Sequence, residues 1–127
     1  MAAGEVEIDV AASPDKVWAL IGDFGGIGAW FPGIEGVRVD GDDRFIKLGP
    51  GEIQERLLSN DDATRIQRYS VLGGVPGLES HEATITVVPR GEGCHVTWAF
   101  DVRPDEAAKM MGAAYGRALE AVRDNFS

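Results

Sequence analysis

The chain has 127 residues, of which 12 are Lys or Arg and 21 are Asp or Glu, so its formal net charge is −9. This acidity argues against a nucleic-acid partner, because the phosphate backbone is bound by clustered cations, and it disfavours adhesion to anionic membranes. Since 44% of the residues are hydrophobic and 26% are charged, we expect one globular domain over residues 1–127.

The beginning of the chain predicts one strand and two short helices. Residues 5–11 alternate between apolar and acidic side chains, as in a strand with one face in water. The segment Ser13–Asp15 offers an N-cap, a first-turn proline and an acidic residue, which together open a helix that ends at Gly22. A second short helical piece, broken by glycine, is expected over 27–31.

The middle of the chain, from residue 34 to residue 100, predicts an antiparallel meander. Short apolar segments alternate there with turns rich in Gly, Pro and Asp, which is typical of strands joined by short connections. The predicted strands lie near residues 37–39, 45–48, 52–58, 65–72, 82–88 and 95–102.

The last segment, residues 104–126, has the period of a long amphipathic helix of about 33 Å. Its apolar face is rich in small side chains, which either leave space above the sheet or allow close helix–sheet contact. One long helix over an antiparallel sheet is an α+β layer architecture. The apolar face consists of Ala107, Ala108, Met111, Ala114, Tyr115, Ala118, Leu119, Val122 and Phe126.

Several short motifs occur in this element order. They are Ala12-Ser13-Pro14 with Val17-Trp18, Asp23-Phe24, Trp30 with Pro32-Gly33, Glu55-Arg56-Leu57 before Asp61-Asp62, Arg68-Tyr69, and Val96-Thr97-Trp98 before Pro104. Their order and spacing resemble the START/Bet v superfamily (SRPBCC), which includes polyketide cyclase/dehydrase-like proteins and plant abscisic-acid receptors. The resemblance covers essentially the whole chain.

The resemblance implies a helix-grip fold, in which a curved seven-stranded antiparallel sheet surrounds the C-terminal helix and encloses an apolar cavity. In this family the small second helix, here with Trp30 and Phe31, closes the cavity entrance. The loops at 48–51 and 72–78 resemble the flexible entrance loops of the family.

Strand alternation places two polar residues in apolar rows that would face the helix. Glu55 shares parity with Ile53 and Leu57, and His81 shares parity with Ile85. A carboxylate in such a lining has a raised pKa unless it is paired, so Glu55 is a candidate acid or base, a ligand-orienting group, or half of a structural pair with an arginine or His81. His81 is expected at the cavity mouth or in solvent.

Aromatic residues and Met111 complete the candidate lining. The alternation around Tyr69 is irregular; the resemblance turns it inward, where it either binds a ligand through its hydroxyl or packs in the core. Trp98, Phe100 and Tyr115 line the cavity or form core in the same way. The candidate ligand-binding residues are Trp30, Phe31, Glu55, Leu57, Tyr69, His81, Ile85, Trp98, Phe100, Met111 and Tyr115.

Other chemistries lack the residues they need, so we expect no metal and no cofactor. Neighbours in a strand point to opposite faces, so neither Ser80-His81 nor Cys94-His95 can form a dyad or share a metal. Two histidines and one cysteine are too few for a zinc site. The segment 25–28 matches neither a dinucleotide-binding motif nor a P-loop.

The cellular context is predicted from absences. No apolar run reaches the roughly 18–20 residues of a membrane span, and the first residues lack the basic and apolar regions of a signal peptide. Cys94 is the only cysteine, which fits a reducing compartment. We therefore expect a cytoplasmic protein without membrane insertion; the sequence specifies no oligomeric state.

Three functions remain after these exclusions. The leading hypothesis is binding of a small hydrophobic ligand, cyclic or lipid-like, in an internal cavity between the sheet and the C-terminal helix. The alternative is an enzyme of the polyketide cyclase/dehydratase type that uses Glu55 or His81 as acid or base. The third is a protein-interaction module, which no exposed apolar stripe or basic patch supports.

Overall fold

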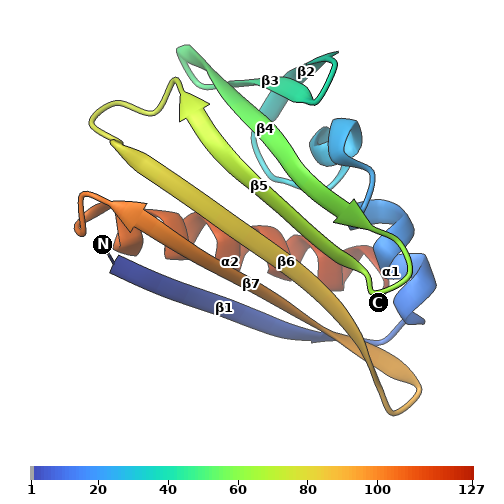
Figure 1. Cartoon of the computed structure of the whole chain (residues 1–127). Helices are drawn as coiled ribbons and strands as arrows, with labels where there is room; N and C mark the ends of the chain where they lie inside the picture. Colours follow the sequence, from blue (N-terminus) through green and yellow to red (C-terminus); the bar gives the residue numbers. More distant parts are fainter. Residues whose placement is uncertain (1) are drawn as a thin grey trace.

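Seven strands form one curved antiparallel sheet in the order β1-β7-β6-β5-β4-β3-β2 (Figure 1). The structure, a computed structural model, describes residues 2–127. The strands are β1 (Ala2–Val10), β2 (Ile34–Asp40), β3 (Asp43–Leu48), β4 (Gly51–Asp61), β5 (Ile66–Gly73), β6 (Ser80–Arg90) and β7 (Gly93–Arg103), and the helices are α1 (Pro14–Ile21), the 3₁₀ helix η1 (Phe24–Ala29) and α2 (Ala107–Asn125).

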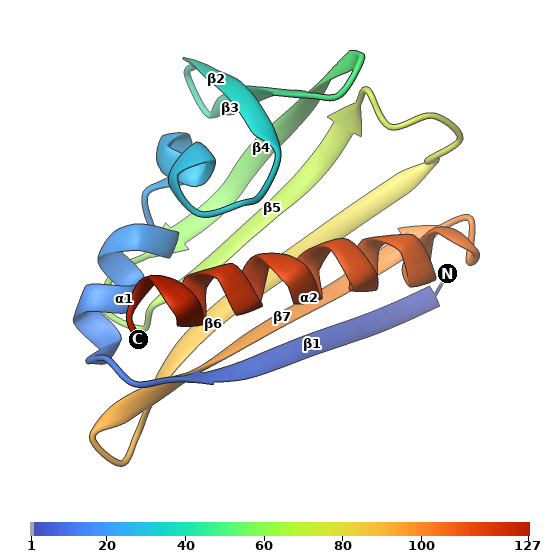
Figure 2. The same cartoon turned by 180° about the vertical axis from the view of Figure 1, so that it is seen from behind.

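The long helix α2 lies on the concave face of the sheet and packs on β1 and β7 (Figure 2). The opposite strands, β2 to β5, curl over the side that α2 does not cover, and η1 packs on β2 there. The predicted α+β helix-grip fold, with a seven-stranded sheet, two short helices after the first strand and a long C-terminal helix, is therefore confirmed.

The first helix begins where the sequence predicts. The Ser13 Oγ accepts a hydrogen bond of 3.3 Å from the Lys16 backbone N–H, and Pro14 occupies the first turn, where its missing N–H costs nothing. The second helical piece differs from the prediction, because η1 begins at Phe24 and ends before Trp30. The first strand also begins earlier and the last helix is shorter than predicted.

The core lies between α2 and the inward row of β7, where alternate residues are buried as period-2 alternation requires. The C-terminal half of α2 supplies buried residues to the same core, so this part of the molecule is filled. No helix within residues 2–127 is both long and apolar enough to cross a membrane.

The backbone pairing between β5 and β6 ends at Tyr69 and Ala83. Closer to the β5–β6 loop, hydrogen bonds that involve side chains take the place of the backbone pairing. The Val71 N–H donates to the His81 Nδ1 atom at 3.1 Å, and the Ser70 Oγ donates to the His81 carbonyl at 2.5 Å. Since buried backbone groups need partners, the His81 ring stands in for a missing strand contact. At this end the two strands are thus held together by side chains.

Candidate ligand-binding site

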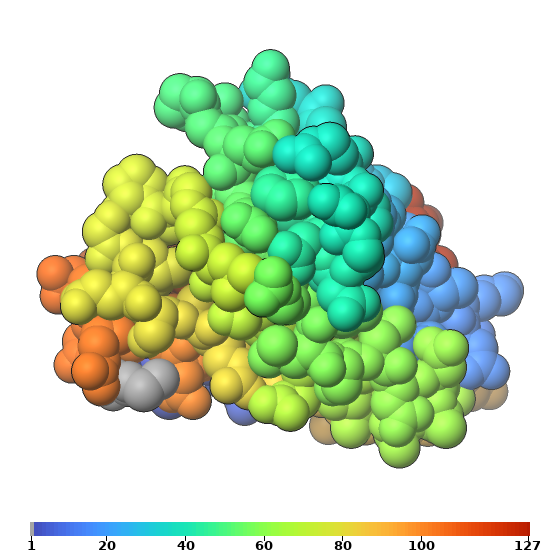
Figure 3. Space-filling model, turned by 45° about the horizontal axis from the view of Figure 1, so that its top comes forward, coloured from blue at the N-terminus to red at the C-terminus, as the bar shows by residue number. Residues whose placement is uncertain are grey.

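A pocket of about 210 Å³ lies between the N-terminal half of α2 and strands β3, β4 and β5. It borders a surface notch between the β3–β4 turn and the β5–β6 loop (Figure 3). Met110, which is 58% exposed, belongs to both the surface and the lining. The lining residues are Ile27, Phe31, Ile34, Ile46, Leu48, Ile53, Glu55, Tyr69, Val71, Val75, Met110, Met111, Ala114 and Tyr115.

The pocket is apolar except for one carboxylate and two phenol groups. The carboxylate is that of Glu55, which is 7% exposed and stands on β4 directly opposite Arg44 on β3. The Arg44 Nε and Nη2 atoms lie 2.8 Å and 2.5 Å from the same Glu55 oxygen, Oε1. This buried ion pair leaves the second oxygen, Oε2, without a hydrogen bond from any part of residues 2–127.

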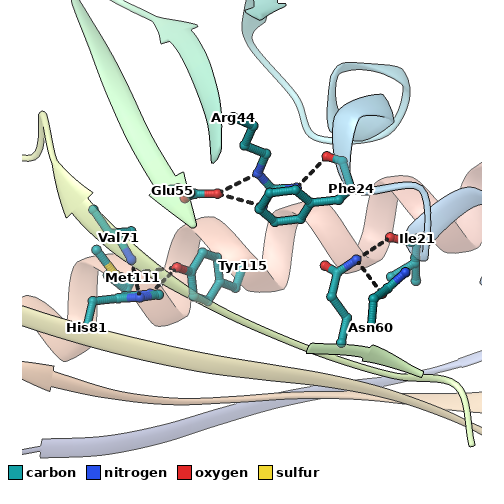
Figure 4. Close-up of polar contacts among 10 residues, drawn as sticks. Ile21, Phe24, Arg44, Glu55, Asn60, Val71, His81, Met111 and Tyr115 are labelled. Atoms are coloured by element: carbon teal, nitrogen blue, oxygen red, sulfur yellow. Dashed lines mark hydrogen bonds and ion pairs between the residues drawn. The ribbon is translucent and has the colours of Figure 1, made fainter. Parts of the chain in front are cut away.

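Arg44 is enclosed on its other sides. Its Nη1 donates to the Phe24 carbonyl at 2.7 Å, and its guanidinium carbon lies 3.8 Å from the centroid of the Phe24 ring (Figure 4). The ring of Tyr69 lies 5.1 Å away. Cation–π contact and hydrogen bonding therefore hold the 1% exposed cation in place, and η1 is what covers it.

The Glu55 pKa is the result of opposing effects. Burial raises the pKa of Glu55 above its ordinary value, and the Arg44 guanidinium beside it opposes that rise. An arginine does not lose its proton in a protein, so protonating Glu55 would leave a buried cation unpaired. At neutral pH the pair is therefore ionised, and the pocket presents a hydrogen-bond acceptor.

His81 belongs to a hydrogen-bonded chain behind the lining (Figure 4). Its Nδ1 accepts from the Val71 N–H, so the proton of the neutral ring is on Nε2, which donates to the Tyr115 hydroxyl at 2.8 Å. The Tyr115 hydroxyl donates in turn to the Met111 sulfur at 3.6 Å. This chain sets both the tautomer of His81 and the direction of the Tyr115 proton.

The same contacts remove His81 from acid–base chemistry near neutral pH. Burial lowers the pKa of His81 to about 4, because the charged ring would be poorly solvated. Its single lone pair already accepts the Val71 N–H, so protonation would also break that bond. His81 therefore acts here as a fixed donor that orients Tyr115.

Tyr69 faces inward and is buried, with Arg44 and Tyr115 as neighbours. Burial raises the pKa of Tyr69 well above its ordinary value, and the nearby Tyr115 hydroxyl adds to the rise. Burial likewise raises the pKa of Tyr115. Both phenols are neutral over any physiological pH and offer hydrogen bonds rather than charge.

A model of the polyketide cyclase/dehydrase and lipid transport family matches residues 1–127. The chain belongs to this family. The superfamily resemblance seen in the sequence is thereby confirmed.

Solved structures show the same fold. The XoxI protein from Bacillus cereus is 26% identical with a TM-score of 0.93, over 99% of this chain and 96% of XoxI. A START superfamily protein from Mycobacterium smegmatis is 16% identical with a TM-score of 0.80, over 100% of each chain. The di-domain ARO/CYC BexL from the BE-7585A biosynthetic pathway is 19% identical with a TM-score of 0.83, over 98% of this chain and 46% of BexL. The curated proteins include no match.

In this polyketide cyclase/dehydrase and lipid transport family member, the candidate residues chosen from the sequence fall into two groups. Five line the pocket together: Phe31, Glu55, Tyr69, Met111 and Tyr115. The other six do not line it: Trp30, Leu57, His81, Ile85, Trp98 and Phe100.

The second group is separated from the pocket by packing. The Trp98 ring stacks on Tyr115 with centroids 3.9 Å apart, so Tyr115 stands between Trp98 and the pocket. Trp30 packs against Trp98 at 5.7 Å. Leu57 shares parity with Glu55 and pairs with Tyr69, but it is only half-buried and lies outside the core.

Arg44 is the residue of the candidate site that the sequence analysis missed. It shares parity with Ile46 and Leu48, both of which line the pocket, so alternation along β3 was the available signal. An arginine two residues after a turn is ordinarily in solvent, and only its pairing with Glu55 in the neighbouring strand reverses that expectation.

Proposed function

We propose that this protein binds a small hydrophobic ligand, cyclic or lipid-like, in the pocket between α2 and strands β3 to β5. The observation that carries the proposal is an apolar pocket that holds only a few polar groups, each on a defined element. This combination is typical of small-molecule sites. Membership of a family described by polyketide cyclisation, dehydration and lipid transport supports the same conclusion.

The energetics are sufficient for useful affinity. Covering about 250 Å² of apolar ligand surface contributes roughly 6 kcal/mol before the costs of association. A pocket of 210 Å³ lies between the roughly 150 Å³ that admits benzene and the roughly 300 Å³ at which drug-sized sites begin. A ring or a short acyl segment fits this range, with the remainder of a longer ligand in the surface notch.

The test is a thermal-shift series with single-ring and fused-ring aromatics and with acyl chains, together with native mass spectrometry of protein purified from its own host. Binding raises the melting temperature with ligand concentration, because only the folded state binds. A matched pair separates the pocket from the surface: Ala114→Leu fills the lining, whereas Ala113→Leu adds the same group to the exposed face of α2. Equal shifts in both variants, or no shift with any compound, contradict the proposal.

A second candidate function, acid–base catalysis on a cyclising or dehydrating substrate, is favoured by one observation. The Glu55 carboxylate is buried, has a raised pKa and keeps one oxygen available in the pocket. An ionised carboxylate of this kind suits a general base, whereas His81 does not, since its lone pair is occupied. Loss of turnover in Glu55→Gln with ligand binding retained supports catalysis; unchanged turnover removes Glu55 from it.

A further inference from the structure

We propose that Glu55 selects the ligand of this pocket: an uncharged molecule of one or two rings that places a hydroxyl or another hydrogen-bond donor against the free carboxylate oxygen. This inference rests on the proposed ligand-binding function and specifies which chemistry the pocket accepts.

The first step is that the two Glu55 carboxylate oxygens have different partners. Both Arg44 contacts reach Oε1, and Figure 4 shows the other oxygen pointing away from Arg44. Glu55 belongs to the pocket lining, so Oε2 is the atom of this carboxylate that a bound molecule can meet. An ionised carboxylate accepts hydrogen bonds and donates none. A ligand that covers it without donating leaves a buried acceptor unpaired, at considerable cost.

The second step concerns the charge that the pocket lining presents to a ligand. Arg44 does not line the pocket, and its Nε, Nη1 and Nη2 atoms are engaged by Glu55 and by the Phe24 carbonyl. No Lys or Arg belongs to the lining. A carboxylate-bearing ligand would thus meet a carboxylate with no available cation, in a region of low dielectric. A ligand that places a carboxylate or another anionic group against Glu55 is excluded on this ground.

The third step is the state of the other polar groups. The Tyr115 hydroxyl already accepts from His81 and donates to Met111, so its hydrogen-bonding capacity is largely used within the protein. The Tyr69 hydroxyl, the other phenol of the lining, is neutral and accepts hydrogen bonds less strongly than a carboxylate, so Glu55 is the strongest open acceptor in the pocket. The volume of 210 Å³ restricts the part of the ligand that reaches it to one or two rings.

The experiment compares three probes by isothermal titration calorimetry at pH 7: 2-naphthol, 2-methoxynaphthalene and 2-naphthoate. The first offers a donor, the second is an ether of the same ring that only accepts, and the third is an anion. The readout is the ratio of the ether and naphthol dissociation constants, compared between wild type and Glu55→Gln. Transfer of each probe from water is identical for both proteins and cancels in this comparison.

We expect the ratio to fall about tenfold in Glu55→Gln, because the amide can turn a donor toward the pocket while its oxygen still accepts from Arg44. The matched control Glu52→Gln removes the same charge from the same strand at an exposed position outside the lining, and should leave the ratio unchanged. Wild type should bind 2-naphthoate most weakly, and Glu55→Gln should bind it better than wild type does.

The outcomes separate the two proposals. If the naphthalenes bind but the ratio is the same in wild type and Glu55→Gln, the donor selection is overturned while ligand binding stands. If acyl chains bind wild type and no naphthalene does, the inference that the ligand has one or two rings is overturned. If nothing binds, the proposed function falls first. Should Glu55→Gln not fold, the double variant Arg44→Met/Glu55→Leu gives the same readout without an unpaired buried charge.

Discussion

The concave face of the sheet has two halves that differ in what covers them. On β1 and β7 the helix α2 packs directly, and Trp98 and Val96 are completely buried beneath it. On β3, β4 and β5 the cover consists of η1, the residue Phe31 and the edge of α2. These elements do not fill the space above the strands, and the unfilled space is the pocket. Both halves are apolar by sequence, so the difference comes from the position of α2 and not from hydrophobicity.

The comparison shows how one sheet combines stability with a site. The filled half provides close packing, in which every methylene contributes dispersion and burial energy. The pocket half gives up part of that packing and instead holds the Arg44–Glu55 pair and the Val71–His81–Tyr115 chain. Substitutions should therefore reduce the free energy of unfolding in the first half and change binding in the second.

The largest expected effect is in the filled half. Trp98→Ala removes a fully buried ring that stacks on Tyr115, and we expect the free energy of unfolding to fall by roughly 4–5 kcal/mol in urea denaturation. Ile53→Val trims the pocket lining and should change it by at most about 0.5 kcal/mol. A loss of about 1.5 kcal/mol in Ile53→Val, which is the upper value for this change at a packed core position, would show that the pocket half is packed as tightly as the core.

The next effect concerns the buried ion pair. Arg44→Met leaves the Glu55 carboxylate buried without its cation, and we expect a loss of roughly 3–4 kcal/mol by the same measurement. The double variant Arg44→Met/Glu55→Leu should recover most of that loss, because neither charge remains. Additive losses in the double variant would mean that the pair contributes as packing and not as compensating charge.

The pH dependence isolates His81. Its folded-state pKa of about 4 lies below the ordinary 6.5, so the unfolded chain binds more protons between these values. Its contribution to stability is thus fully present above pH 6.5 and is lost as the pH falls toward 4, by about 2 kcal/mol at pH 5. His81→Gln should flatten that part of the curve of unfolding free energy against pH.

The control for this measurement is the other histidine. His95→Gln, outside the pocket on β7, should retain the decline attributed to His81. If the curve stayed steep in His81→Gln and flattened in His95→Gln, the decline in unfolding free energy would come from His95. That result would contradict the buried, neutral state of His81.

A small effect on stability is expected where the effect on binding is largest. Ala114→Leu places three additional carbons into the pocket from α2, and we expect the unfolding free energy to change by less than about 1 kcal/mol. The ligand-induced rise in melting temperature should disappear, as measured with any compound that stabilises wild type. A large loss of stability instead would show that the lining cannot accept volume.

Strand alternation carried much of the site prediction, because the side-chain direction of a strand is a local property. Glu55 was placed inward from its parity with Ile53, and both line the pocket. Parity alone could not separate lining from core, so Trp98 and Ile85 were grouped with Glu55 although Tyr115 and the packing of α2 close them off.

Two other features depended on pairs of elements. Arg44 is buried only because β3 pairs with β4 in the register that sets it opposite Glu55, and because η1 places the Phe24 carbonyl and ring against it. His81 is neutral with its proton on Nε2 only because the β5–β6 ladder ends before Val71, whose N–H then reaches the ring. In both cases the deciding partner lies on another element, so the alternation of one strand does not identify it.

The sequence by itself determined the order of elements, the α+β class and the inward face of the regularly alternating strands β4, β6 and β7, since caps, turns and hydrophobic period act over a few residues. The tertiary structure decided where α2 lies on the sheet, and hence which half is filled and which half holds a pocket. It also decided the partners of Glu55 and His81, because a buried polar group takes its charge and its proton from neighbours that are distant in the chain.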